Sequence, residues 1–93
     1  MAIIHVPGKD KGKIFIFALS TCVWCKKTKK FFSDHQIAYD YVDVDLLSGE
    51  EREQTLRELK KWNERLSFPT IVINNKDCIL GYDQEKLDKL IHD

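Results

Sequence analysis

The sequence predicts an α/β protein with a four-stranded mixed sheet flanked by three helices, preceded by an extra N-terminal strand or arm. Three observations lead to this prediction. The run at 14–18 is apolar at every position, a helical pattern of apolar residues follows it directly, and two further apolar runs flank a turn-forming segment at 74–77. Because a run without polar positions is typical of a strand buried on both faces, we expect helices on both sides of the sheet.

The first twelve residues are expected to form an N-terminal arm or an edge strand, ahead of the main domain at 13–93. A short apolar stretch gives way at 7–12 to Pro, Gly, Lys and Asp residues, which form turns and contribute little to a core. The strand at 14–18 then leads to Cys22, where a helix is expected to begin.

This first helix is expected to end near Ser33-Asp34. Its apolar side repeats at helical spacing and consists of Trp24, Thr28, Phe31 and His35, with Cys25 and Phe32 beside them. The other side is rich in lysine, and we interpret it as a solvated face made of Lys26, Lys27, Lys29 and Lys30.

A second strand and a second helix are expected in the middle of the chain. Residues 37–45 alternate between polar and apolar side chains in their later part, which is typical of a strand with one wetter face. Ser48 is followed three positions later by Glu51, a capping-box pattern that predicts the start of a helix. The apolar stripe of this helix is narrow and consists of Leu56, Leu59, Trp62 and Leu66.

The last part of the chain predicts a hairpin and a helix. The apolar runs at 70–73 and 78–80 are separated by Asn74-Asn75-Lys76-Asp77, so the two strands should pair antiparallel. Gly81 ends the pattern, and Asp83 is expected to cap the final helix. The apolar positions of that helix are Leu87, Leu90 and Ile91. The strand-helix-strand unit at the start favours a parallel pair in the same sheet.

Composition argues against several classes of function. Acidic and basic side chains balance at 15 each and no long Lys/Arg block occurs, so we expect no nucleic-acid partner and no membrane binding. Residues 1–7 lack a basic n-region, and their apolar run is too short for a signal peptide or a membrane span. We therefore expect a cytoplasmic protein in a reducing compartment, with a monomer as the default state.

Cys22-Val23-Trp24-Cys25 is the most informative stretch of the chain. There are three cysteines in 93 residues, and chance would put two of them at this spacing only about six times in a hundred. A helix that begins at Cys22 directs unpaired backbone N–H groups and the positive end of its dipole at the first sulfur, which favours a thiolate there.

The two sulfur atoms of this motif are expected to have different roles. Residues three apart lie on neighbouring turns of a helix, so Cys22 and Cys25 can close a disulfide. Cys22, at the exposed tip, is expected to attack a substrate disulfide. Cys25, aligned with the apolar Phe32, is expected to be shielded and to resolve the mixed disulfide. These two cysteines are the candidate catalytic residues.

Metal binding is the alternative for the cysteine pair. A closed zinc site needs four ligands; Cys78 offers a third, although its place in an apolar strand favours a small buried hydrophobe. The three histidines are scattered singly, so no metal ligands are assigned. An iron–sulfur cluster shared by two chains is a further alternative, and an adaptor with incidental cysteines is a third interpretation.

Four features together resemble the glutaredoxin family, part of the thioredoxin superfamily. They are the Cys22-Val23-Trp24-Cys25 motif, the helix after it, Ser67-Phe68-Pro69-Thr70 before a strand, and Gly81-Tyr82-Asp83 before the last helix. The similarity spans roughly residues 13–92 and implies a thioredoxin fold. It also implies that Pro69 is cis and stands beside the dithiol, that Phe68 offers main-chain hydrogen bonds to substrate, and that Asp83 accepts the amino group of a ligand.

The candidate substrate-binding residues are Thr21, Trp24, Phe68, Pro69, Gly81 and Asp83. Trp24, between the two cysteines, has two interpretations: an exposed docking surface for partner proteins, or packing beside the dithiol.

Two positions depart from the family pattern where glutathione would bind. Leu19 stands where the family typically has a lysine, and Leu80-Gly81 replaces its pair of glycines. These departures argue against glutathione as the reductant. Redoxins that an enzyme reduces, including those serving ribonucleotide reductase and those fed by ferredoxin-linked reductases, are an equally good comparison.

The expected function is that of a dithiol–disulfide oxidoreductase, a glutaredoxin-like electron carrier that reduces protein disulfides by thiol–disulfide exchange. Its expected partners are disulfide-containing proteins and an electron donor, either a reductase or glutathione. No bound organic cofactor is expected. The alternative is an iron–sulfur or metal binding and transfer module that uses Cys22, assisted by Cys25 or Cys78.

Overall fold

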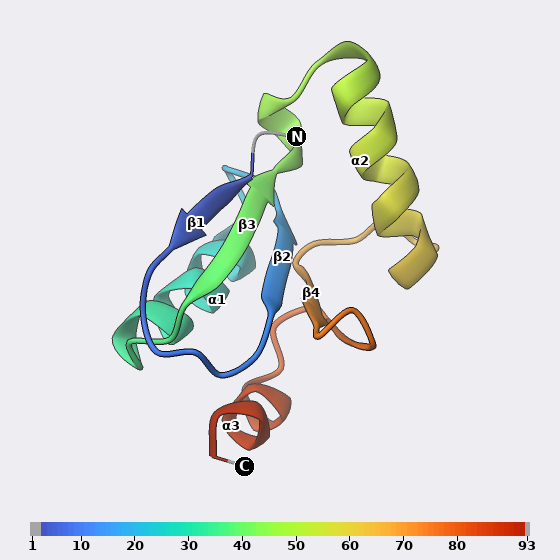
Figure 1. Ribbon diagram of the computed structural model, residues 1–93. Coiled ribbons are helices and arrows are strands. Elements are labelled where there is room, and N and C mark those ends of the chain that lie inside the picture. Colours follow the sequence, from blue (N-terminus) through green and yellow to red (C-terminus); the bar gives the residue numbers. More distant parts are fainter. Residues whose placement is uncertain (1–2, 93) are drawn as a thin grey trace.

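The computed structural model describes residues 3–92, which form a five-stranded sheet with three α-helices (Figure 1). The strands are β1 (Ile4–Val6), β2 (Ile14–Ala18), β3 (Tyr39–Asp43), β4 (Thr70–Ile73) and β5 (Asp77–Leu80). The helices are α1 (Val23–Asp34), α2 (Gly49–Trp62) and α3 (Gln84–His92), and the 3₁₀ turn η1 (Val44–Leu46) follows β3. Residues 1, 2 and 93 of the expected arm and domain lie outside the described residues.

The strand order in the sheet is β1-β3-β2-β4-β5. β2 runs parallel to β3, while β4 is antiparallel to β2 and β5 is antiparallel to β4. The expected mixed sheet and its C-terminal hairpin are therefore confirmed. The extra N-terminal strand is present as β1, which pairs antiparallel with β3 at the edge of the sheet.

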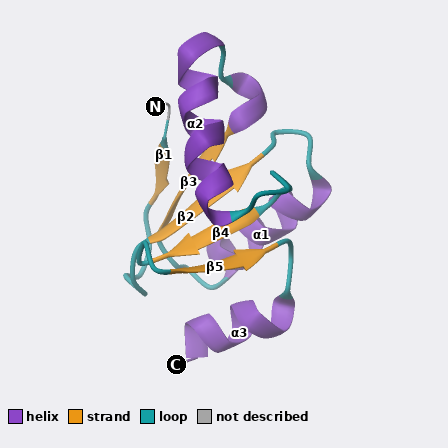
Figure 2. Cartoon of the chain, turned by 90° about the vertical axis from the view of Figure 1, so that its right-hand side faces the viewer, coloured by secondary structure: helices purple, strands orange, loops and turns teal. Residues whose placement is uncertain are grey.

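Apolar clusters cover both faces of the sheet. On one face, α1 and α3 pack Phe32 and Leu87 against strand residues such as Ile16. On the other face, α2 packs Leu59 against Phe17 and its neighbours. Figure 2 shows α2 in front of the sheet and α1 behind it. The prediction of helices on both sides of the central strand β2 is confirmed.

Helix α1 begins and ends where the sequence predicts. Cys22 is its N-cap residue, and the helix continues to Asp34. The side chains that α1 buries are Cys25, Thr28, Phe31 and Phe32. Trp24, which was predicted on the same stripe, is 53% exposed instead, because it lies in the first turn of the helix at the end of the sheet rather than over it.

The second strand is shorter than predicted. The alternating pattern suggested 37–45, but β3 covers only Tyr39–Asp43. Asp43 lies opposite Ala18, the last residue of β2, so the chain beyond it has no parallel neighbour with which to pair. Instead it turns into η1 and buries Val44 in the cluster on the α2 face.

Helix α2 begins after the predicted N-cap residue, but it differs from the prediction in its capping contact and at its C-terminal end. Ser48 is the N-cap residue, but its side chain makes no capping hydrogen bond. Gly49, the first residue of the helix, has a φ of +58°, a left-handed conformation that turns the chain directly after Ser48, where the predicted side-chain cap is not made. At the other end the helix stops at Trp62, and Leu66 packs against the same core from the loop that follows.

The hairpin and the last helix follow their local signals. Asn74 and Asn75 have φ values of 56° and 54°, the left-handed conformation that asparagine tolerates in tight hairpin turns. Asp83 caps α3, since its carboxylate accepts a hydrogen bond of 3.1 Å from the N–H of Lys86. Within residues 3–92, none of the helices combines the length and the apolar character needed to cross a bilayer.

Candidate functional site

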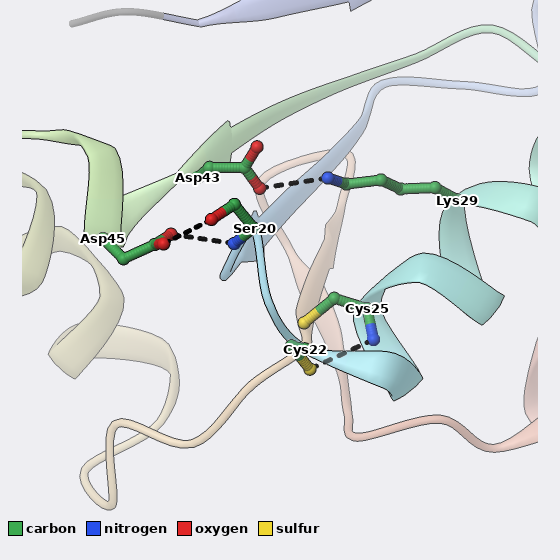
Figure 3. A network of polar contacts seen from close by, with 6 residues as sticks. All are labelled: Ser20, Cys22, Cys25, Lys29, Asp43 and Asp45. Carbon is green, nitrogen blue, oxygen red and sulfur yellow. Dashed lines mark hydrogen bonds and ion pairs between the residues drawn. The ribbon is translucent and has the colours of Figure 1, made fainter.

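The cysteine pair lies at the start of α1, directly after the loop that leaves β2 (Figure 3). Both cysteines are free thiols. Cys22 is partly exposed, and its Sγ accepts a hydrogen bond of 3.2 Å from the backbone N–H of Cys25. A backbone donor and the positive end of the helix dipole thus face the Cys22 sulfur, an arrangement that stabilises negative charge on it.

Cys25 has a different environment three residues further along. Its side chain has no exposed surface and belongs to the core cluster beneath α1. Burial, followed by the hydrogen bond with Cys22, raises the pKa of the Cys25 thiol to about 12, although a hydrogen bond with the Leu19 backbone and, less strongly, the ammonium of Lys29 act in the opposite direction. Cys25 is therefore a neutral thiol near pH 7. The predicted contrast between an exposed and a shielded sulfur is present.

A cleft of about 210 Å³ lies close to the dithiol, lined by Trp24, Phe68, Pro69, Gly81 and Tyr82. The rings of Trp24 and Tyr82 are stacked, with their centroids 5.6 Å apart. The Phe68–Pro69 peptide bond is cis, as the resemblance implied. The N–H of Gly81 donates a hydrogen bond of 2.8 Å to the carbonyl oxygen of Pro69, which joins the two segments that form the floor of this cleft.

The cleft brings together four of the six predicted substrate-binding residues. The two others, Thr21 and Asp83, are not among its lining residues. Thr21 is an exposed residue just before Cys22. Asp83 caps α3 with its carboxylate, so it already has a structural partner. Tyr82, which sequence reasoning did not assign, is part of the cleft because it lies between Gly81 and Asp83 and stacks on Trp24.

Two polar contacts beside the cysteines were also missed by sequence reasoning (Figure 3). Lys29, predicted to belong to a solvated face, is only 19% exposed in its side chain and pairs with Asp43 at 3.0 Å. Its ammonium lies 3.9 Å from the centre of the Tyr41 ring. The second contact joins Ser20 to Asp45, whose carboxylate accepts hydrogen bonds from both the Ser20 N–H and its hydroxyl. Both pairs join residues at least 14 positions apart, so no local sequence pattern could reveal them.

Cys78 lies on the other face of the sheet from the dithiol. Its neighbour Ile79 points into the cluster that contains Cys25, so Cys78 faces α2, and its Sγ is 3.8 Å from the carbonyl oxygen of Trp62. Within the described part of the chain, no three His, Cys, Asp or Glu residues are grouped so that they could hold a metal ion.

Comparison with known proteins settles the family. The family model for glutaredoxin matches residues 14–78. The chain belongs to the glutaredoxin family. The matched segment runs from β2 into β5 and contains the whole Cys22-Val23-Trp24-Cys25 motif and the Phe68–Pro69 bond.

Two solved structures and one relative found by sequence agree with the glutaredoxin assignment. A glutaredoxin from Methanosarcina mazei is 42% identical, with a TM-score of 0.88 over 98% of this chain and 88% of that one. Methanoredoxin from Methanosarcina acetivorans is 40% identical, with a TM-score of 0.87 over 92% of this chain and 90% of that one. An uncharacterized glutaredoxin-like protein from Clostridium pasteurianum is 35% identical over 84% of this chain and 96% of that protein.

These similarities establish both the fold and the general chemistry. The five-stranded sheet with three helices is a thioredoxin-type fold with one extra N-terminal strand, as in glutaredoxin structures. Membership in the glutaredoxin family gives the chain a role of the thiol–disulfide oxidoreductase type, and the Cys22 and Cys25 motif is consistent with a redox-active pair.

Proposed function

We propose that this chain reduces disulfide bonds in other proteins, with Cys22 as the nucleophile and Cys25 as the resolving thiol. The observation that supports this assignment best is the difference in environment between the two sulfurs. Cys22 is accessible and faces a backbone N–H donor, whereas Cys25 is fully buried with its pKa raised to about 12. Only the first sulfur is placed to meet a large substrate.

The proposed reaction has two exchange steps that move two electrons. In the first, the Cys22 thiolate attacks one sulfur of the substrate disulfide; a mixed disulfide forms, and the other substrate sulfur leaves as a thiolate and takes up a proton. In the second, the Cys25 thiol loses its proton and its sulfur attacks Cys22, which releases the second substrate thiol. The chain is left with a Cys22–Cys25 disulfide, and no organic cofactor is needed because sulfur carries both electrons.

The substrate is proposed to dock on the surface around Cys22. Cys22 lies at the end of the sheet where β2, β3 and β5 end. The large apolar side chains exposed at this end are Val23, Trp24, Leu46 and Leu80. The cleft beside Trp24 adds Phe68 and Pro69. Such a surface fits an extended substrate segment with apolar side chains near its disulfide. Thr21, Gly81 and Asp83 remain proposed as the rim of this surface.

The electron donor is proposed to be a protein reductase rather than glutathione. Leu19, at the place where the family typically has a lysine, packs against the apolar cluster under α2. Leu80, in place of a glycine, is 53% exposed beside Gly81 and adds apolar surface where a charged tripeptide would otherwise bind. The proposal includes a monomer in a reducing compartment such as the cytoplasm, where a dithiol can be regenerated.

A trapping experiment tests the assignment of the two cysteines. With insulin as a model protein disulfide, Cys25→Ser should accumulate a covalent mixed disulfide through Cys22, because no second thiol is present to release it. Cys22→Ser should form no such complex. Cys78→Ser is the matched control and should reduce insulin at the wild-type rate. Equal trapping by Cys22→Ser and Cys25→Ser would contradict the assignment.

The donor is tested separately with the oxidised protein. A flavin-dependent or ferredoxin-linked thiol reductase with its electron source should restore the dithiol, whereas glutathione with glutathione reductase should do so slowly. Replacing Leu19 with Lys should increase the rate with glutathione. Rapid reduction of the wild-type protein by glutathione would overturn this part of the proposal and leave the roles of the cysteines intact.

A further inference from the structure

A two-point contact joins the loop that carries Cys22 to the segment that follows β3 (Figure 3). The Ser20 N–H donates to Oδ1 of Asp45 at 2.8 Å, and the Ser20 hydroxyl donates to Oδ2 of the same carboxylate. Both carboxylate oxygens are thus engaged by one residue. A contact of this kind fixes the orientation of the Ser20 peptide as well as its position.

The topology of the sheet explains why these two residues meet. β2 and β3 are parallel neighbours, with Ala18 opposite Asp43, so the chain leaves both strands at the same edge. Ser20 and Asp45 each lie two residues beyond that edge. Ser20 is also two residues before Cys22, and the N–H of Cys22 donates to the carbonyl oxygen of Leu19 at 3.2 Å. The loop therefore closes around Ser20 just before the reactive sulfur.

We infer that Asp45 is a positioning residue for Cys22, acting through Ser20. By holding the loop between β2 and α1, it keeps the Cys22 sulfur at the N-cap of α1, within hydrogen-bond distance of the Cys25 N–H. Without the contact, the loop has more conformations, and the sulfur spends less time facing that donor. The inference rests on the proposed role of Cys22 as the nucleophile.

The charge on Asp45 is maintained by the same contact. The Ser20 hydroxyl first, and then the Ser20 N–H, hold the pKa of the Asp45 carboxyl below its usual value of 3.8, and Arg52 on α2 adds to the effect. Because the folded pKa is lowered, the contact is fully present above pH 3.8 and is lost as pH falls through the lowered value. It therefore operates throughout the neutral range.

The test measures the rate at which iodoacetamide alkylates Cys22, in variants shown by circular dichroism to be folded at the assay temperature. Asp45→Ala should slow alkylation at pH 7 by roughly threefold to tenfold, the effect of about one lost hydrogen bond. Ser20→Ala, which keeps the N–H donor, should have a smaller effect. Ser20→Thr, which keeps both donors, should restore the rate to near the wild-type value.

A double variant and a matched control complete the test. The Ser20→Ala, Asp45→Ala double variant should be no slower than Asp45→Ala alone, because both changes remove the same contact. Asp34→Ala removes a carboxylate from the exposed Lys30–Asp34 pair on α1 and should leave the rate unchanged. If Asp45→Ala does not fold, Asp45→Asn takes its place, because it keeps an acceptor for the Ser20 N–H. Its alkylation rate should lie between the wild-type rate and the roughly threefold to tenfold slower rate expected for Asp45→Ala.

The outcomes separate a positioning role from a structural one. Lower melting temperatures with wild-type alkylation rates and an unchanged rate–pH profile would mean that the contact only stabilises the fold, and would overturn the inference. Additive effects in the double variant would also overturn it. Alkylation needs no protein substrate, so it tests this inference separately from the proposed function. Slow alkylation of Asp45→Ala, together with a wild-type protein that fails to reduce insulin, would leave this inference standing and reject the proposed function.

Discussion

The proposed chemistry of this chain depends on two sulfur atoms whose surroundings differ although they are three residues apart. Cys22 lies at a helix N-cap, where the backbone N–H of Cys25 reaches its sulfur. Cys25 lies one turn deeper, in the core under α1. Removing a thiolate from water is unfavourable, so the buried position protects Cys25 from reaction with groups other than the neighbouring sulfur of Cys22.

The raised pKa of Cys25 predicts how the stability of the reduced protein depends on pH. The folded value is about 12 and the unfolded value 9.0, so the contribution of this thiol is fully present below pH 9 and is lost as pH rises toward 12. The difference in free energy of unfolding between wild type and Cys25→Ala should therefore shrink on going from about pH 8 to about pH 10.5. Urea titrations under reducing conditions measure it; a constant difference would contradict the assigned environment.

Lys29 is expected to help Cys25 lose its proton during the second exchange step. Its ammonium acts to lower the pKa of Cys25, and Asp43 and the Tyr41 ring hold it in place. Lys29→Met should raise the pKa of Cys25 further and slow closure of the Cys22–Cys25 disulfide, by roughly twofold to fivefold at pH 7. Stopped-flow release of the mixed disulfide measures the rate.

The control for Lys29 lies on the same helix. Lys30 is 73% exposed and pairs with Asp34, so Lys30→Met changes the net charge equally without altering the surroundings of Cys25. It should close the disulfide at the wild-type rate. Equal slowing by both variants would indicate an effect of net charge and remove the specific role of Lys29.

Among the secondary-structure elements, the N-terminal ends of α2 and α3 show that two similar capping patterns in the sequence can lead to different hydrogen bonds. Asp83 and Ser48 both occupy N-cap positions that the sequence predicts. The Asp83 carboxylate accepts from the Lys86 N–H at 3.1 Å, whereas the Ser48 side chain makes no capping hydrogen bond. The difference arises at Gly49, whose φ of +58° turns the chain just after Ser48.

This contrast gives a prediction for stability. Asp83→Ala should lower the free energy of unfolding by about 1 kcal/mol, the usual effect of losing a side-chain cap. Ser48→Ala, its matched control at the start of α2, should change it by less than about 0.5 kcal/mol. Urea denaturation of both variants measures the effect. A larger loss of unfolding free energy for Ser48→Ala than for Asp83→Ala would contradict the conclusion that Asp83, and not Ser48, caps its helix with its side chain.

For the molecule as a whole, the sheet divides the interior into two regions with separate tasks. The face under α1 and α3 contains Cys25 and supports the proposed redox pair. The face under α2 contains Leu59 and Leu19, and its apolar cluster packs α2 against the opposite face of the sheet. Cys78 faces the second region, toward Trp62, so the sheet separates it from the dithiol.

The core under α2 should be essential for folding. Leu59 has no exposed surface, and Leu59→Ala should destabilise the protein by about 2–5 kcal/mol through lost burial and a residual cavity. Leu46, which is 70% exposed, is the matched control, and Leu46→Ala should change stability by less than about 0.5 kcal/mol. The free energies of unfolding in urea compare the two. A similar loss for both would contradict the arrangement of the core.

Much of the architecture was already evident in local patterns. The apolar run at 14–18, the helical repeat after Cys22 and the turn at Asn74-Asn75 each reflect interactions between residues close in the chain, and each element lies where it was expected. The Cys22 and Cys25 pair was recognised for the same reason, because helix geometry brings residues three apart onto neighbouring turns.

What the local patterns could not provide were the contacts between distant segments. β3 ends at Asp43 because its neighbour β2 ends opposite it, and Lys29 is partly buried because Asp43 and Tyr41 lie beside it. The sequence was sufficient to predict a redox pair at the start of a helix, since that depends on nearby residues. The surroundings of the pair, from Tyr82 in the cleft to Asp45 holding Ser20, depend on strand order, which brings together residues that no local pattern connects.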